Sequence, residues 1–185
     1  MKRKRPEYRV SLSQQVGGKD AWGTEFGAQI YGRINVDLLS VGQGTLVLID
    51  YAGLERSDVS FQREAVVESL RKHRPRLLFI ALNLGDPDVQ ENISLALERR
   101  GEWLLARREG QQPSVLGKRL TPEQQTTLER VWAGGELVSS DFSEDNVKLS
   151  TASNRLAWLW KAGLIERVEG TAASGGREHR YYPIG

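Results

Sequence analysis

The sequence predicts an α/β domain followed by a smaller domain of helices and a two-stranded hairpin. Two apolar runs, at residues 45–50 and 76–83, have the length and composition of strands buried on both faces of a sheet. Segments with helical spacing alternate with these runs, as they do in layered α/β domains. After residue 119 the order changes to helices followed by two strands around a glycine-rich turn. We therefore expect a sheet layer with packed helices and a separate C-terminal domain.

In the first two thirds of the chain, expected strands and helices alternate. A short strand at residues 8–12 precedes a helix at residues 25–41, in which apolar residues recur at helical spacing. Gly42 and Gly44 are expected to end this helix; a dinucleotide fingerprint would instead follow a strand and open a helix. The later elements are a helix at 61–73, a strand at 76–83, a helix from 87 to about 100 and a strand at 103–106.

The length and composition fit one large or two small domains. The chain has 185 residues, of which 39% are hydrophobic, and no apolar run approaches the ~20 residues of a transmembrane helix. Because it has no cysteine, disulfides, thiolate catalysis and cysteine zinc sites are excluded, and we expect a cytoplasmic protein. The expected parts are a basic tail (1–8), an α/β domain (9–110), a linker (111–118) and a C-terminal domain (119–185). The tail is either solvated or an arm that binds phosphate.

The C-terminal domain opens with a strong helix-start signal. Thr121 is a hydroxyl N-cap, Pro122 suits the first helical position, and Gln124 stands three residues after the cap, as in a capping box. The pair Gly134-Gly135 ends this helix. Residues 137–147 are acidic and are expected to form a short second helix, which gives the order of a helix-turn-helix.

The most informative segment is residues 150–167, STASNRLAWLWKAGLIER. On a helix, one stripe of this segment is apolar and faces a core; it comprises Ala152, Leu156, Leu159, Trp160 and Gly163. The opposite stripe is available for contacts and comprises Asn154, Trp158 and Lys161. Gly163 can end the helix in a left-handed conformation, after which residues 164–168 alternate as a strand and residues 177–182 return as a second strand.

This order resembles the winged helix-turn-helix domains of bacterial transcription regulators, in which such a helix enters the major groove of double-stranded DNA. The resemblance covers the last third of the chain. It implies DNA contacts by Lys148, Ser150, Thr151, Asn154, Arg155, Trp158, Lys161, Arg177 and Arg180. Asn154 is expected to pair with adenine and Arg155 with guanine, while the basic residues near the hairpin hold phosphates.

Two features leave alternatives open in this domain. Trp158 either packs under the hairpin tyrosines Tyr181 and Tyr182, stacks on nucleic acid, or anchors a protein partner. From residue 119 to 185 the chain has 8 Lys and Arg against 9 Asp and Glu, whereas DNA-binding domains usually have a basic excess. The domain is therefore either a DNA-binding module with a polarised surface or a protein-binding module.

The N-terminal part carries a second ordered pattern. Its residues are Phe26, Gly27, Leu38, Val47, Leu48, Ile49, Asp50, Gly53, Ser60, Phe61, Glu64, Leu82, Asn83, Val89, Ile93, Ala96 and Leu97. Over about residues 20–100 this pattern is similar to the STAS-like domains of unknown function, relatives of the anti-sigma-factor antagonist fold. The resemblance implies binding of a partner protein, and some relatives are switched by phosphorylation of a serine that aligns near Val59. Ser60 is thus expected to be a switch or a helix N-cap, and Asp58 a cap or turn residue.

No pattern in the sequence indicates an enzyme. Asp50 and Asp58 lack a second acidic motif or a phosphate loop, and His73 and His179 lack companion ligands. We expect no cofactor and no metal, and a DNA-binding regulator of bacterial or mobile-element type that assembles with a protein partner through its STAS-like domain. It is expected to dimerise, because two-fold operators match two-fold proteins. The alternative is an adaptor that resembles anti-sigma-factor antagonists and does not bind DNA.

Overall fold

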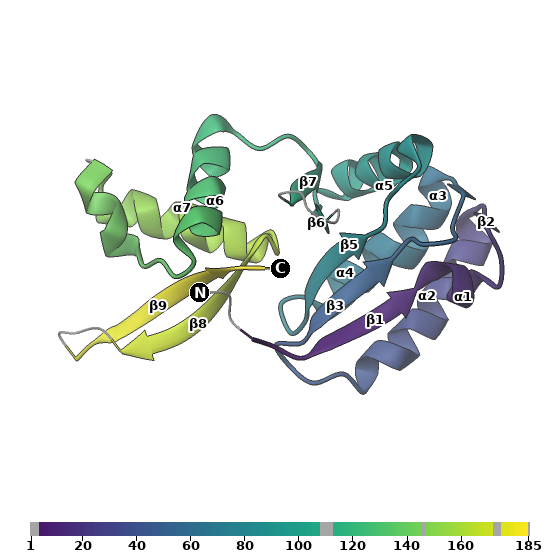
Figure 1. Cartoon of the computed structure of the whole chain (residues 1–185), viewed down its shortest axis with the longest axis horizontal. Coiled ribbons are helices and arrows are strands. Elements are labelled where there is room, and N and C mark those ends of the chain that lie inside the picture. The colour runs from purple at the N-terminus through teal and green to yellow at the C-terminus, as the bar shows by residue number, and fades with distance from the viewer. Residues whose placement is uncertain (1–3, 108–112, 146, 172–174, 185) are drawn as a thin grey trace. The chain divides into compact units, whose positions relative to one another are not determined.

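The computed structural model describes residues 4–107, 113–145, 147–171 and 175–184 (Figure 1). The chain divides into two compact units, an N-terminal unit of Arg5–Arg119 and a C-terminal unit of Leu120–Gly185 with Met1–Lys4. Helices and strands are mixed, with a sheet that combines parallel and antiparallel strands, so the expected α/β class is confirmed. Within the described residues, no helix combines the length and the apolar character that a membrane crossing requires.

The N-terminal unit contains a five-stranded sheet in the order β1-β3-β5-β6-β7. The first four of these strands are parallel, and helical segments connect each one to the next: β1 (Glu7–Ser11), β3 (Leu46–Asp50), β5 (Leu78–Leu82) and β6 (Trp103–Arg107). β7 (Ser114–Gly117) runs antiparallel to β6 at one edge. Every residue of β3 and β5 is buried, as their continuous apolar runs predict.

Helices cover one face of this sheet, and Figure 1 shows them on the same side of β1, β3 and β5. They are α2 (Thr24–Leu39), α3 (Val59–Gln62), α4 (Glu68–His73) and α5 (Pro87–Arg100), with a π-helical segment, Arg63–Val67, between α3 and α4. Alternate strand residues, such as Val47 and Phe79, form one core with the apolar stripes of these helices. The remaining elements are α1 (Leu12–Val16) and the two parallel strands β2 (Asp20–Ala21) and β4 (Arg56–Ser57).

The helix expected at residues 61–73 begins earlier than predicted, because a different residue caps it. The Asp58 carboxylate accepts a hydrogen bond from the Phe61 backbone N–H at 2.7 Å and caps α3. Ser60 is therefore the second residue of α3, and the N-cap expected there is wrong. The helix expected at residues 25–41 ends at Leu39, with Ser40 as its C-cap, before the glycines predicted to end it.

The linker expected at residues 111–118 is corrected in part. Residues 113–118 belong to the described structure, and four of them form β7, which hydrogen-bonds to β6. Leu116 is buried in the core. Gly117 has a φ of 101°, and a Cβ there would lie 2.4 Å from the Glu102 carbonyl oxygen, so this position requires glycine. Residues 111 and 112 lie outside the described residues, as do residues 1–3 of the expected basic tail.

The C-terminal unit is a set of helices followed by a hairpin. Its elements are α6 (Pro122–Gly134), a 3-10 helix η2 (Ser139–Asp145), α7 (Leu149–Lys161), β8 (Ile165–Thr171) and β9 (Arg177–Pro183). The capping box predicted for α6 is confirmed, since Thr121 and Gln124 each accept a hydrogen bond from the other's backbone N–H. Gly163 has a φ of 72°, as predicted for the residue that ends α7.

The second helix expected at residues 137–147 is a 3-10 helix of seven residues. Leu137 instead pairs with Tyr181 of β9, with mutual backbone hydrogen bonds of 2.9 and 2.8 Å. The Asp141 carboxylate accepts from the Val138 backbone N–H at 2.8 Å. The bridge between Leu137 and Tyr181 holds Leu137 beside β9, so helical backbone begins only after this residue.

Candidate nucleic-acid interface and the Trp22 pocket

Helix α7 has one buried stripe and one accessible stripe. Ala152, Leu156 and Leu159 are fully buried and pack the helix into the C-terminal unit. Successive residues turn by about 100°, so the residues opposite this buried stripe can be identified from their spacing. They are Ser150, Asn154, Ala157, Trp158 and Lys161, called the α7 outer stripe below. Ser150, Asn154 and Lys161 are exposed, and Ala157 and Trp158 are half-buried, so a partner has access to this side of the helix.

The outer stripe includes four of the expected DNA contacts and adds Ala157, which sequence reasoning missed. The helical period that selected Asn154, Trp158 and Lys161 also selects Ala157, because it lies three residues after Asn154 and four before Lys161. Its methyl group projects little from the helix. A ligand can therefore approach the backbone of α7 more closely on the Ala157 side of the stripe than on the Trp158 side.

Arg155 and Thr151 lie on the flank of α7 between its two stripes, and both are half-buried. Arg155 lies near the first turn of α6, where it is one of the groups that lower the pKa of the exposed Glu123 carboxyl. The largest causes of that lowering are hydrogen bonds to the Glu123 backbone and to the Thr121 side chain, and attraction to Arg155 adds to them.

The two arginines expected on the hairpin lie on opposite faces of it. In the register of β8 and β9, Arg177 pairs with Thr171 and Arg180 pairs with Val168. Residues an odd number apart along a strand project from opposite faces. Arg177 is exposed on the face it shares with Glu169 and His179. A flat partner therefore contacts one of the two arginines and not both.

Arg180 is held by neighbours within the C-terminal unit. Its guanidinium forms ion pairs with Glu136 at 2.9 Å and with Glu178 at 4.0 Å, and donates to the Thr171 carbonyl oxygen at 3.5 Å. Its side chain lies across Gly170, where a Cβ would come within 2.8 Å of the Arg180 Nε. Arg180 thus ties the hairpin to the segment after α6.

A third arginine on the hairpin, Arg167, makes a contact that sequence reasoning missed. The Arg167 guanidinium carbon lies 3.4 Å from the centre of the Trp160 ring, in a cation–π contact. Arg167 also pairs across the hairpin with the buried Tyr181. Trp158, for which three interpretations stand, is half-buried on α7. Lys148, immediately before α7, is exposed.

The candidate chemical groups of the N-terminal unit have structural partners. The Asp50 carboxylate accepts from the Ala52 backbone N–H at 3.0 Å and from the Asn83 amide at 2.7 Å, as expected for a turn residue. His73 is buried beside Asn35, and burial, followed by the nearby Arg76, lowers its pKa. Over the part of the chain that the structure describes, His, Asp and Glu side chains form no group of three that could hold a metal.

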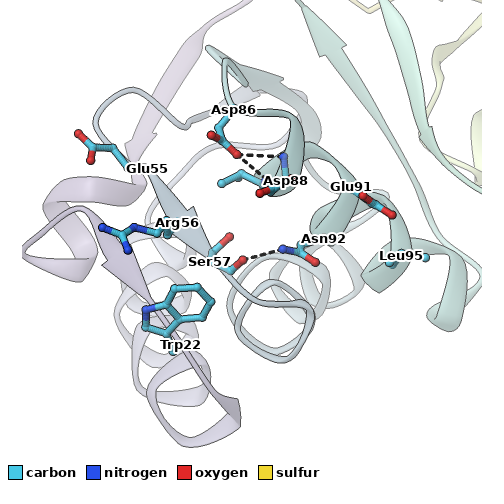
Figure 2. Close-up of a pocket in the computed structure, with 10 residues that line it drawn as sticks. Trp22, Glu55, Arg56, Ser57, Asp86, Asp88, Glu91, Asn92 and Leu95 are labelled. Carbon is cyan, nitrogen blue, oxygen red and sulfur yellow. Dashed lines mark hydrogen bonds between the residues drawn. The ribbon is translucent and has the colours of Figure 1, made fainter.

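The N-terminal unit also has an open pocket of about 750 Å³ beside an exposed tryptophan, called the Trp22 pocket (Figure 2). Trp22 is 52% exposed. Figure 2 shows Trp22 and Arg56 on one side and Glu91 and Leu95, both from α5, on the other. The residues that line the pocket are Trp22, Glu55, Arg56, Ser57, Asp86, Asp88, Val89, Glu91, Asn92 and Leu95.

Several polar groups around the Trp22 pocket already have partners. Glu55 pairs with Lys19 at 2.6 Å, Arg56 pairs with Asp20 at 3.3 Å, and the Asn92 amide donates to the Ser57 carbonyl oxygen at 2.8 Å. Asp86 caps α5 by accepting from the backbone N–H groups of Asp88 and Val89. The lining of the pocket thus has more acidic than basic residues, with Trp22 and Leu95 on opposite sides.

The sequence was also compared with known proteins. It matches no model of a known protein family, and the search of curated proteins finds no match.

Proposed function

We propose that the C-terminal unit is a winged helix-turn-helix domain that binds double-stranded DNA through the α7 outer stripe. The observation that carries this proposal is the accessible outer stripe of α7, whose exposed residues Ser150, Asn154 and Lys161 are polar, on a helix fixed by a separate buried stripe. The order α6, η2, α7, β8, β9 and the exposed Lys148, Lys161 and Arg177 support it. Such cations hold phosphates, while short polar side chains contact base edges.

We further propose that the N-terminal unit is a STAS-like domain that binds a protein partner. A mixed sheet with helices packed on one face, and an Asp58-capped helix after β3 and β4, support this proposal. Ser60 lies at the second position of that helix and is half-buried. In this scheme the protein is a DNA-binding regulator that assembles as a homodimer on two-fold sites.

Binding to duplex DNA tests the proposal, and one substitution on α7 supplies the control. The full chain is expected to retard a pool of genomic DNA fragments, with an affinity that falls as salt rises. Ala157→Glu places a carboxylate and extra bulk in the centre of the outer stripe and is expected to abolish retardation. Gln29→Glu adds the same charge on the exposed surface of α2 and is expected to leave retardation unchanged.

The second candidate function is that of a protein-interaction adaptor, and the Trp22 pocket favours it. Exposed tryptophans beside pockets are typical of protein-binding surfaces. The near balance of charge in the C-terminal unit is also compatible with a docking domain. An adaptor has no phosphate contacts, so the full chain would leave genomic DNA unretarded even at low salt.

A further inference from the structure

We propose that α7 selects an adenine–thymine base pair through Asn154 and that Arg155 takes no part in base selection. This inference rests on the proposed DNA binding. It adds which base is recognised and which of two neighbouring residues recognises it.

Asn154 has the position and the chemistry for this role. Its side chain is exposed on the α7 outer stripe, in the second turn of the helix, where winged helices contact base edges. An asparagine amide offers one acceptor oxygen and one donor nitrogen. In the major groove, adenine presents a donor, N6–H, beside an acceptor, N7, so the amide can bond to both. Guanine presents two acceptors there, which asparagine cannot match in the same way.

Short side chains lie before Asn154 and on one side of it. Ser150 lies one turn before it and Ala157 about one turn after it, and both side chains are short, while the half-buried Trp158 lies one turn after it on the other side. The Asn154 amide is therefore the longest group over the first two turns of the stripe. The Ala157 methyl group adds a small apolar surface of the kind that contacts the thymine methyl group.

Arg155 is turned away from this surface. It follows Asn154 by one residue, which rotates its side chain by about 100° around the helix axis, toward the buried stripe. Arg155 is half-buried, whereas Asn154 is exposed. Arginine is the residue type that most often recognises guanine, but the Arg155 side chain is directed away from the outer stripe.

Lys161 is the one charged residue of the outer stripe. From its position at the end of α7, we assign it a phosphate contact. It follows Asn154 by seven residues, or about 10 Å along the axis, and lies at the end of α7. The first turns of a recognition helix enter the groove, so its last turn faces the backbone. Base selection by α7 therefore depends on Asn154.

Selection from a random duplex pool, followed by affinity measurements with variants, tests the inference. The full chain is expected to enrich fragments with adenine at one position. Replacing that pair by guanine–cytosine is expected to weaken binding by about 5- to 150-fold, the range for one bidentate contact. Asn154→Ala should remove this preference. Arg155→Ala, at the adjacent residue, should keep it, and Asn154→Arg should move it toward guanine.

The outcomes separate this inference from the proposed function. Enrichment of a guanine that Arg155→Ala abolishes would overturn the assignment to Asn154 and leave DNA binding intact. Binding with a base preference that Asn154→Ala does not change, or with no base preference, would overturn it in the same way. If the wild-type chain retains no duplex at low salt, the proposed function fails and the inference fails with it.

Discussion

The Asp58 side chain sets the start of two helices at once. Its carboxylate accepts from the Phe61 backbone N–H at 2.7 Å, and both of its oxygens accept from the Gly23 backbone N–H at 3.1 Å, immediately before α2. Asp58 and Ser60 both precede the apolar run of the helix and both are good caps. The additional hydrogen bond from the Gly23 backbone N–H favours Asp58 as the cap. Gly23 lies 35 residues earlier in the chain, so no local sequence pattern predicts this contact.

A cap comparison at residues 58 and 60 tests this assignment. Asp58→Ala removes the cap of α3 and the contact to the start of α2, so the free energy of unfolding is expected to fall by about 1–2 kcal/mol. Ser60→Ala is expected to change it by less than about 0.5 kcal/mol. Urea unfolding followed by circular dichroism measures both. A larger loss for Ser60→Ala than for Asp58→Ala would place the cap at Ser60 after all.

At the scale of elements, long patterns were predicted well and short ones were not. The apolar runs of β3 and β5 and the caps of α5 and α6 involve several residues that agree with one another. β7 has four residues, of which Leu116 alone is fully buried, so no period is visible in it. It forms because β6 offers a free edge and Gly117 permits close approach to Glu102, both of which depend on the folded sheet.

Some properties of the candidate DNA contacts could be predicted from the sequence, and others could not. The helical period identifies the α7 outer stripe, and the strand period places Arg177 and Arg180 on opposite faces of the hairpin. The partner of Arg180 does not follow from any period, because Arg180 pairs with Glu136, a carboxylate 44 residues earlier in the chain. Such ion pairs decide which cations remain available to phosphate.

Single substitutions of the two hairpin arginines test this division. Arg180→Ala removes the tie between the hairpin and Glu136, and the thermal midpoint is expected to fall by a few degrees, since an exposed ion pair contributes about 1 kcal/mol or less. Arg177→Ala should leave the midpoint unchanged and make the salt dependence of DNA affinity shallower by about one unit. Calorimetry and fluorescence anisotropy measure the two effects. A lower midpoint for Arg177→Ala, or a shallower slope for Arg180→Ala alone, would reverse the roles.

At the scale of the whole molecule, charge is almost balanced. The chain has 26 Lys and Arg against 24 Asp and Glu, which gives a net charge of +2. Residues 120–185 have 7 basic and 9 acidic residues, so any attraction to DNA depends on where the charges lie and not on their sum. The exposed cations near the α7 outer stripe and the hairpin are Lys148, Lys161 and Arg177.

These three cations predict a shallow salt dependence. Three phosphate contacts per protomer give a slope of about −3 in log affinity against log salt, or a loss of about 60-fold between 50 and 200 mM. Fluorescence anisotropy with a duplex of about 20 base pairs, at a stoichiometry fixed by light scattering, measures the slope. Replacing Lys2, Arg3 and Lys4 by serine should leave it unchanged if the basic tail is solvated. A slope of −6 or steeper per bound protomer that becomes shallower in this variant would instead make the tail an arm on the phosphate backbone, and the C-terminal unit would not be the main source of affinity.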